Sequence, residues 1–426
     1  MSGFENLTNL KLRAGYGVSG SDNTSNYQAL SRVGNGDDEV YVFNGGAVPG
    51  ATIVRLGNAA LSWEEIEMLN FGIDAGFYDG RLNFTAEYYE KSTKGLLLPF
   101  APAFEAGAIQ NPTGNLGEVS NKGFEFSVNS INVMKDKFRW TTDFNFATVQ
   151  NEIISLPEDA DRFNGVNISR VGEEIGALYG FETDGIFQNW DEVYSHALQN
   201  QSIDTFDDDG NPIYSGSQDQ NVINNNTAPG DLRFVDQNGD GFVEAENDRV
   251  ILGSTIPDFT WGLTNNFTLG GFDISILLQG VHGVDAFNGL RVFQERSIGS
   301  WGNSNTRVLQ SWSGEGSTNE VFRAALTDPN SNQRTSDYWV EDASFVRIKN
   351  VRVAYSPPSK VMNQLGMGGL SASVYLVGTN LFTFTEYSGF DPEIGLRNGN
   401  NPETAGFDNG GIPLTRQVTM GVRLSF

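Results

Sequence analysis

A run of short polar residues near the middle of the chain has the spacing of a calcium-binding loop. The segment 236–241, Asp-Gln-Asn-Gly-Asp-Gly, places oxygen-bearing side chains at loop positions one, three and five, and a glycine at position six. Calcium loops use those oxygens as ligands and that glycine for a sharp turn. Position twelve is Asn247, so the next carboxylate comes one residue late. The alternative is a polar turn that binds no ion. The pattern predicts calcium ligands from Asp236, Asn238, Asp240, Glu244 and Asp248.

Catalytic chemistry has little support in the residue types. The chain has no cysteine, which excludes a thiolate nucleophile, a thiolate metal site and a disulfide framework. Its two histidines, His196 and His282, lie far apart in the sequence. Nucleophile-elbow and phosphate-loop patterns are absent. The sequence therefore predicts a protein that is not an enzyme, with calcium as the single ion that it could bind.

The calcium-like segment lies in the most acidic part of an acidic chain. The formal net charge is −26, and residues 150–257 alone hold 21 carboxylates against four basic residues, a charge of −17. Because Lys and Arg do not cluster, nucleic acid is not expected as a partner. Such charge suits a solvated external loop, and solubility alone is an adequate reason for it.

Alternating apolar and polar residues recur along the whole chain, as the strands of a sheet require. Residues 69–77 alternate in this way, and the turn 78–81 that follows carries an Asp-Gly hairpin signal. About ten strands are expected, most of them near the ~9–11 residues that cross a bilayer when tilted. They are expected around residues 10–16, 69–77, 82–89, 124–129, 138–146, 259–263, 272–278, 351–355, 370–376 and 418–426.

The connections between these strands alternate strictly between short and long. Short connections are expected near 78–81, 131–137 and 270–271, with a moderate one at 357–369. Long ones are expected at 17–66, 92–121, 150–257, 282–343 and 382–415. Transmembrane barrels have this asymmetry, with short periplasmic turns and long extracellular loops. A soluble β-sandwich is the alternative. No run of 18 apolar residues exists that could form a transmembrane helix, and the first 17 residues lack the features of a signal peptide.

In a barrel, alternation assigns every strand residue to the lipid or to the lumen, since a slip of one residue would exchange the two. Residues expected to face lipid are Phe71, Ile73, Phe84, Phe126, Phe144, Ile274 and Leu376. Residues expected to face the lumen are Asn70, Asp74, Glu87, Arg139, Asp143 and Asp273.

The last ten residues, 417–426, alternate strictly and end on an aromatic residue. Such a strand resembles the C-terminal signal that outer-membrane assembly machinery recognises, although an ordinary amphipathic strand would have the same pattern. The signal would consist of Val418, Met420, Val422, Leu424 and Phe426.

Several segments together resemble the SusC/RagA family of TonB-dependent outer-membrane transporters. They extend over nearly the whole chain in the order found in that family, and they are Gly117–Ser127, Tyr179–Gln188, Asp231–Gly253, Phe345–Asn350 and Thr379–Glu393. The family carries a carboxylate at position twelve of its calcium-like segment, so the displaced Asp248 departs from the pattern.

The resemblance implies an all-β fold: about ten antiparallel strands of a larger transmembrane barrel of about 22 strands, with long extracellular loops. It implies that residues 1–426 are the C-terminal part of the barrel, with 150–257 as a long acidic loop region. The plug, the TonB box and the first half of the barrel would be absent. The implied setting is the outer membrane of a Gram-negative bacterium of the Bacteroidota type.

The predicted function is TonB-dependent import of a nutrient, a glycan or a peptide. The expected partners are outer-membrane lipid, a SusD-like surface lipoprotein, the outer-membrane assembly machinery, and TonB through the missing N-terminal part. Two alternatives remain: a secreted all-β glycoside hydrolase, which needs two carboxylates about 5–10 Å apart in a cleft, and a cell-surface glycan-binding protein.

Overall fold

A computed structural model describes residues 6–22, 26–35, 40–100, 110–199, 203–206, 212–214, 227–295, 303–325, 328, 330–393 and 401–425. Ten strands pair in sequence order in one antiparallel sheet, which we call the wall. They are β1 (Leu7–Ser21), β6 (Glu64–Phe77), β7 (Leu82–Pro99), β8 (Thr113–Lys135), β9 (Phe138–Thr148), β21 (Phe259–Leu269), β22 (Phe272–His282), β25 (Phe345–Tyr355), β26 (Ser371–Thr385) and β28 (Gln417–Ser425). A further strand, β10 (Gln150–Ser155), pairs with β8. The prediction of about ten antiparallel strands is confirmed.

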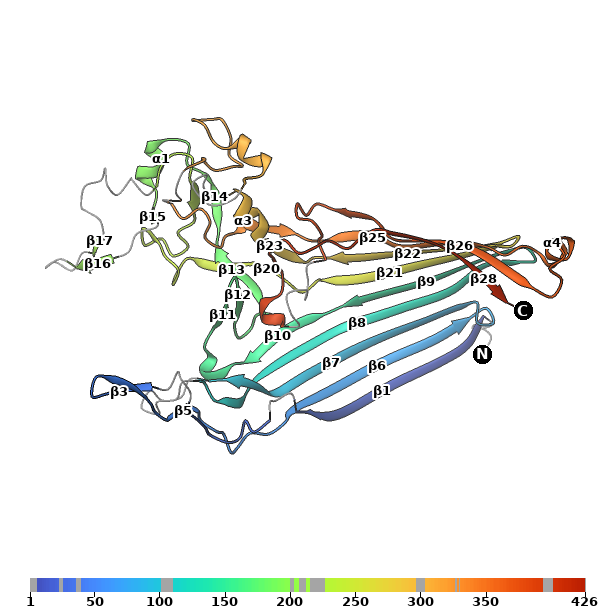
Figure 1. Cartoon of the computed structure of the whole chain (residues 1–426), viewed down its shortest axis with the longest axis horizontal. Helices are drawn as coiled ribbons and strands as arrows, with labels where there is room; N and C mark the ends of the chain where they lie inside the picture. The colour runs from blue at the N-terminus through green and yellow to red at the C-terminus, as the bar shows by residue number, and fades with distance from the viewer. Residues whose placement is uncertain are drawn as a thin grey trace.

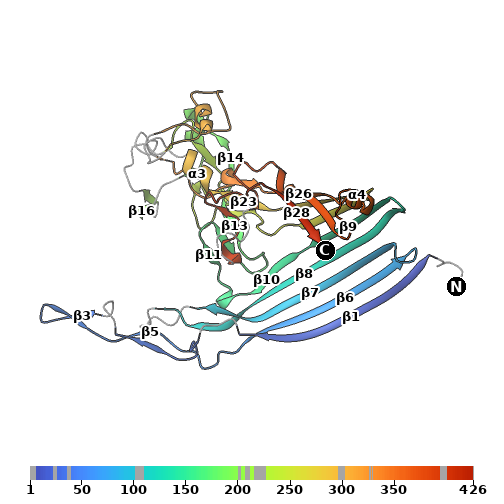
Figure 2. The ribbon, with the colours of Figure 1, turned by 45° about the vertical axis from the view of Figure 1, so that its right-hand side comes forward.

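Figures 1 and 2 show the wall as a long, curved sheet with β1 and β28 at its two edges. The short connections lie at one end, which we call the turn end, together with the helix α4 (Ser359–Gln364) and both labelled termini (Figure 1). The larger connections gather at the opposite end, the cap end. The predicted alternation of short and long connections is therefore present except between β7 and β8, whose connection (100–112) is shorter than the one between β25 and β26 at the turn end (356–370).

The register separates the wall into two chemically different faces. On one face, Phe126 is opposite Ala86 of β7 and Phe146 of β9, and its ring lies 6.4 Å from Phe84 and 6.5 Å from Phe144. Pairing carries this apolar face across to Ile274 and Leu376. All the residues predicted to face lipid lie on this apolar face, and those predicted to face the lumen lie on the opposite, polar face.

The predicted loop at 92–121 is wrong, because β7 and β8 continue as a paired hairpin to Pro99 and from Thr113. Toward the cap end the two faces of this hairpin exchange polarity. Lys94 and its partner Glu118 lie on the side that was apolar further down, while Val119 on the other side packs in a cluster with Ile153 and Leu156. Apolar and polar residues still alternate in this part of the hairpin. The sequence prediction followed one continuous apolar face, and so it ended each strand where the polarity of the faces reverses.

The predicted loop region at 150–257 connects wall strands at the cap end, and much of its described part is folded and packed. Together with the described parts of the connections 283–344 and 386–416 it builds one body at the cap end, which we call the cap (Figure 1). Its core contains Leu178, Phe234, Phe322 and Trp339, so residues from two different connections share one core. Residues 200–202, 207–211 and 215–226 of this region lie outside the described part of the chain.

The cap contains several small sheets and short helices. One four-stranded sheet consists of β11 (Arg162–Asn164), β12 (Asn167–Ser169), β13 (Ala177–Phe181) and β20 (Arg249–Gly253). A three-stranded sheet joins β23 (Asp285–Asn288), β24 (Val340–Asp342) and β27 (Phe407–Asp408). Two-stranded pairs are β14 (Thr183–Ile186) with β18 (Leu232–Phe234), β15 (Leu198–Gln199) with β19 (Phe242–Val243), and β16 (Ile203–Phe206) with β17 (Pro212–Tyr214). The cap helices are α1 (Trp190–Ser195) and α3 (Gly289–Glu295), with 3-10 turns η2 (Pro157–Asp159), η3 (Thr306–Gln310), η4 (Asp337–Trp339) and η6 (Pro402–Thr404).

A separate protrusion lies between β1 and β6. It consists of the ribbon β2 (Arg32–Gly34) with β5 (Thr52–Arg55) and the hairpin β3 (Val40–Phe43) with β4 (Gly46–Pro49). Figure 2 shows this hairpin extending away from the cap end of the wall. All four side chains of β3 are exposed, which gives the protrusion an apolar surface.

Candidate functional site

The calcium-like loop folds tightly around its own carboxylates. The side chain of Asp236 accepts hydrogen bonds from the N–H groups of Gly239, at 2.7 Å, and Gly241, at 2.8 Å. Asp240 accepts from the N–H of Phe242 at 2.9 Å. Both glycines have positive φ, 76° at Gly239 and 91° at Gly241, which explains why the turn needs them. The predicted turn is therefore present, and its carboxylates stabilise it through backbone amides.

Asp248, the carboxylate that follows the twelfth position, is fully buried and joins the two ends of the loop. Its Oδ1 accepts from the N–H of Gln237 at 2.8 Å, and its Oδ2 accepts from the N–H of Glu244 at 2.7 Å. Asp248, which lies one residue after the twelfth position, therefore has a structural role in the loop. Glu244 in turn accepts a hydrogen bond from the side chain of Asn247.

These contacts engage carboxylates that the calcium prediction assigns to the ion. Within the part of the chain that the structure describes, no three or more His, Cys, Asp or Glu side chains converge as a metal-holding group. The loop has oxygen atoms of the right type, but calcium requires six to eight of them at about 2.3–2.6 Å from one point. Calcium binding by Asp236, Asn238, Asp240, Glu244 and Asp248 therefore stays a prediction.

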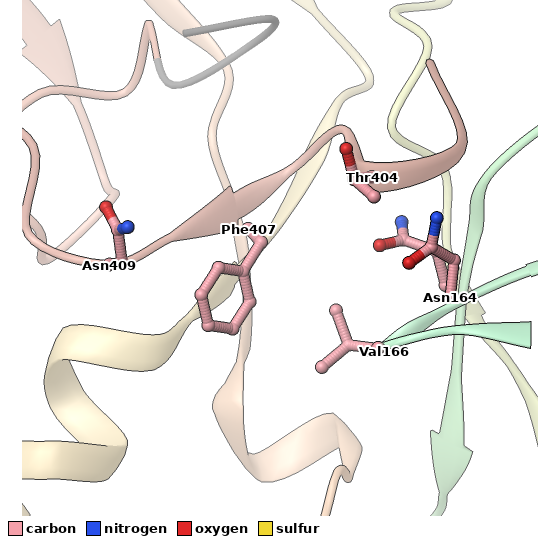
Figure 3. A pocket seen from close by; sticks show the side chains of 7 residues that line it. Asn164, Val166, Thr404, Phe407 and Asn409 are labelled. Atoms are coloured by element: carbon pink, nitrogen blue, oxygen red, sulfur yellow. The ribbon is translucent and has the colours of Figure 1, made fainter. Parts of the chain in front are cut away.

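A hollow of about 430 Å³ lies in the cap between the β11–β12 hairpin and the segment around β27 (Figure 3). Figure 3 shows the amide side chains of Asn164 and Asn409, the hydroxyl of Thr404 and the ring of Phe407 around this space. Asn164 and Asn409 are exposed. The lining combines hydrogen-bonding groups without formal charge with the apolar side chains of Val166 and Phe407. Sequence reasoning missed this site, because its two walls are more than two hundred residues apart in the chain.

The polar face of the wall carries a bonded network of charges near its first strands. The guanidinium of Arg13 donates to both oxygens of Asp74, at 3.0 and 3.1 Å, and to Glu87 at 3.1 Å. Asn70 and Thr85 donate to the same two carboxylates. The predicted lumen residues Asp74 and Glu87 are therefore brought together, and Arg13, which the sequence analysis did not select, is their partner.

Two carboxylates stand close to each other where the cap joins the wall. Glu174 accepts from the Ser254 hydroxyl at 2.7 Å, and Asp285 accepts from the Ser254 N–H at 3.0 Å. Burial raises the pKa of the Glu174 carboxyl, and the negative charge of Asp285 raises it further. Burial also raises the pKa of Asp285, with added repulsion from Asp342 and Asp258. Ionisation of these two carboxyls is therefore less favourable than it would be in water.

The family-like segments meet each other in space at buried ion pairs. Arg347, from the segment Phe345–Asn350, is 1% exposed and pairs with Asp391 at 2.6 Å and with Glu393, both from the segment Thr379–Glu393. Asp231, which begins another of these segments, is fully buried and pairs with Arg323 at 2.8 Å. These motifs therefore connect wall strands and cap segments.

The predicted assembly signal lies in β28, at the edge of the wall. Val418, Met420, Val422 and Leu424 are all exposed on the apolar face, where pairing sets Val422 opposite Val374 and Met420 opposite Leu376. Phe426 lies outside the described residues. The amphipathic strand is present, and its role in assembly stays a prediction. No described helix has the length and apolar character that a membrane-spanning helix needs.

Comparison with known proteins places the chain among bacterial receptors. It is 32% identical over 437 residues to the TonB-dependent receptor P3 of Formosa agariphila, covering 99% of this chain and 40% of that receptor. It is 27% identical over 431 residues to the TonB-dependent receptor SusC of Bacteroides thetaiotaomicron, covering 99% of this chain and 38% of SusC. No protein-family model matches the chain.

A solved structure supports the fold. The chain superposes on the structure of the RagAB peptide transporter with a TM-score of 0.71 and 22% identity, covering 99% of this chain and 41% of the matched chain. The chain spans about 40% of the length of the receptors that it matches.

A curved antiparallel wall with one apolar face, one polar face and a folded cap at one end defines a segment of an outer-membrane β-barrel protein. Along its whole length, the chain is homologous to TonB-dependent receptors that include SusC, which are outer-membrane proteins of Bacteroidota. Its relatives are receptors and transporters, which are not enzymes. The alternative of a glycoside hydrolase therefore has no support.

Proposed function

We propose that this chain forms the C-terminal part of the wall, together with part of the surface cap, of a receptor that imports a nutrient across the outer membrane. The observation that carries the proposal is the position of a hollow, lined by amide, hydroxyl and apolar side chains, in a folded cap over one end of a wall whose inner face is polar. A solute bound in the cap would enter the lumen along groups that can replace its hydrogen bonds to water. The plug and the other strands would come from the rest of the receptor.

The lining of the hollow favours a neutral glycan as the cargo. Amide and hydroxyl groups both donate and accept hydrogen bonds, as sugar hydroxyls require, and an aromatic ring can pack against the apolar face of a sugar. The acidic cap would repel an anionic cargo. A peptide is the second candidate, because the RagAB transporter to which the chain is structurally similar carries peptides.

The partners follow from the same proposal. TonB would act through the plug carried by the rest of the receptor, and a SusD-like lipoprotein would close over the cap. The exposed aromatic and aliphatic side chains of the β3–β4 protrusion support such a contact, since Tyr41 is 56%, Val42 75% and Phe43 67% exposed. Apolar patches of this kind on a surface protein commonly mark an interaction site.

The test is growth and cargo uptake by cells that carry the complete receptor with a double substitution, Asn164→Ala and Asn409→Ala. Both side chains are exposed, so folding is retained, and the loss of about two hydrogen bonds should weaken the apparent affinity for a neutral oligosaccharide by about tenfold. Asn363→Ala, in α4 at the turn end, is the matched control. Unchanged oligosaccharide uptake with impaired peptide uptake would favour the peptide, and no effect on either would refute the site.

For calcium, we infer a weak site in the 236–248 loop that fills at the millimolar concentrations found outside cells. The experiment compares protease resistance of the loop in the complete receptor, with calcium and with chelator. Chelation should reduce the resistance of the wild type and leave that of Asp240→Ala unchanged. If chelation leaves the wild type as resistant as before, the loop is a polar turn.

A further inference from the structure

The apolar face of the wall carries a hollow near its cap end, at a different place from the hollow in the cap. It has a volume of about 390 Å³ and lies at the ends of β21, β22, β25 and β26. Phe259 pairs with His282, and Val346 pairs with Phe384, so these four lining residues all lie on the apolar face. Val281 and Phe345 also line the hollow and alternate onto the polar face, so the hollow lies at the strand ends and is bordered on one side by the apolar face.

Aromatic residues gather on the apolar face of this part of the wall. Trp261 lies two residues from Phe259 on the same face. Its ring packs directly on Gly280, where an added Cβ would lie 2.1 Å from Nε1 of Trp261. Phe382 and Phe384 follow on β26, 54% and 62% exposed. Trp and other aromatic side chains gather where the hydrocarbon of a bilayer meets its headgroups. The hollow thus sits where acyl chains end and headgroups begin.

A cation stands beside the hollow. The guanidinium of Arg416 lies 5.5 Å from the centre of the Phe382 ring, two residues along β26 from Phe384 of the hollow. Arg416 is exposed and forms no ion pair with any described residue, although the chain has twice as many acidic as basic residues. A guanidinium binds phosphate well because its planar set of donors matches the phosphate oxygens.

The other border of the hollow is acidic and hydroxylated. Asp342, Glu386, Ser344 and Thr385 line it. Carboxylates would repel a phosphate, but they accept hydrogen bonds from sugar hydroxyls. We propose that the hollow and Arg416 form a binding site for a phosphorylated glycolipid of the outer leaflet. Its acyl chains would lie against Phe259, Val346 and Phe384, its phosphate on Arg416, and its sugar hydroxyls on the acidic border. This site is independent of cargo import.

The test measures lipid binding to the complete receptor, purified in mild detergent, by native mass spectrometry with bisphosphorylated lipid A as the probe. Arg416→Gln should weaken lipid A binding by about five- to tenfold, and Arg416→Lys should restore part of it. Arg423→Gln is the matched control, because Arg423 lies in β28, the strand that begins directly after Arg416, and pairs with Ser373 on the polar face.

Phe384→Ser tests the acyl-chain part and should also weaken lipid A binding. Cargo uptake by the same variants should be unchanged, which separates this site from the proposed import function. An equal loss in Arg423→Gln, or no loss in Arg416→Gln, would overturn the proposal. If phosphatidylglycerol, which has no sugar, binds as tightly as lipid A, the hollow is a general acyl-chain groove and the glycolipid assignment is wrong.

Discussion

The wall and the cap bury their apolar residues against different partners. In the cap, Leu178, Phe234 and Trp339 have no exposed surface, and the protein itself supplies the surroundings. In the wall, Leu12 is 74% and Met420 72% exposed, and hydrogen bonds between strands hold the sheet together. The cap therefore supplies its own apolar surroundings, whereas the wall depends on lipid to cover its apolar face.

The largest effect is expected for Trp339→Ala in the cap core. Removing this fully buried ring should reduce the stability of the cap by about 3–5 kcal/mol, because the cavity is lined by side chains from separate connections. Hydrogen exchange should become faster in the cap, while the wall keeps its protection. Trp190→Ala, at a half-exposed position on α1, is the control. Equal loss of protection in the wall would mean that wall and cap are not independent.

A charge placed on the apolar face should affect the wall and spare the cap. Phe126→Arg should destabilise the receptor in lipid vesicles by about 2–4 kcal/mol, because a guanidinium would be buried in hydrocarbon. Ser127→Arg places the same charge one residue further along, on the polar face, and should have little effect. Equal effects in urea unfolding would contradict the assignment of the two faces.

The acidic loop of the cap offers a smaller and more local effect. Asp248→Ala leaves the N–H groups of Gln237 and Glu244 without their buried acceptor and should cost about 1–3 kcal/mol of local stability. Faster proteolysis confined to residues 236–248 is the expected readout. Glu246→Ala, an exposed carboxylate of the same loop, should leave the rate unchanged.

The smallest expected effect is a pH dependence at the junction of wall and cap. The pKa values of Glu174 and Asp285 are raised in the folded state, so folding binds protons over a range of pH in which the unfolded chain has released them. Stability is therefore highest below that range and falls as the pH rises through the raised pKa values. Cap protease resistance should be greater at pH 5 than at pH 7.5.

Glu174→Gln should reduce this difference by raising resistance at pH 7.5, since the amide keeps an acceptor for Ser254 without the buried charge. The exposed neighbour, in Glu173→Gln, serves as the control. A wild-type cap that becomes less resistant as the pH falls would contradict the direction derived from burial.

The sequence was sufficient for the membrane part of the wall because each strand there repeats a local pattern. The Asp79-Gly80 turn, with φ of 54° and 79°, is encoded by residues next to each other. Beyond Tyr88 the same hairpin continues with its polarity reversed, so Lys94 and Glu118 were assigned to a loop. The polarity of the two faces reverses because cap residues pack on one face of these strands. The local sequence does not indicate which face the cap covers.

The cap could not be predicted in the same way, because its contacts join distant parts of the chain. Trp339 and Phe234 share one core from two separate connections. The hollow in Figure 3 needs Asn164 and Asn409 to come together, and no spacing rule connects them. In the calcium-like loop, composition correctly indicated a turn but not that Asp248 would be used by backbone amides.

The even number of strands in the wall has a consequence for how such a sheet can evolve. A chain that traverses the sheet ten times returns to the side on which it started, between β1 and β28. If a single strand were gained or lost, every later connection would move to the opposite end of the sheet. A cap segment would then lie on the wrong side of the membrane. Duplication or deletion of a whole hairpin preserves sidedness. The circumference of the sheet is therefore expected to vary in steps of two, whereas the cap connections are free to diverge residue by residue.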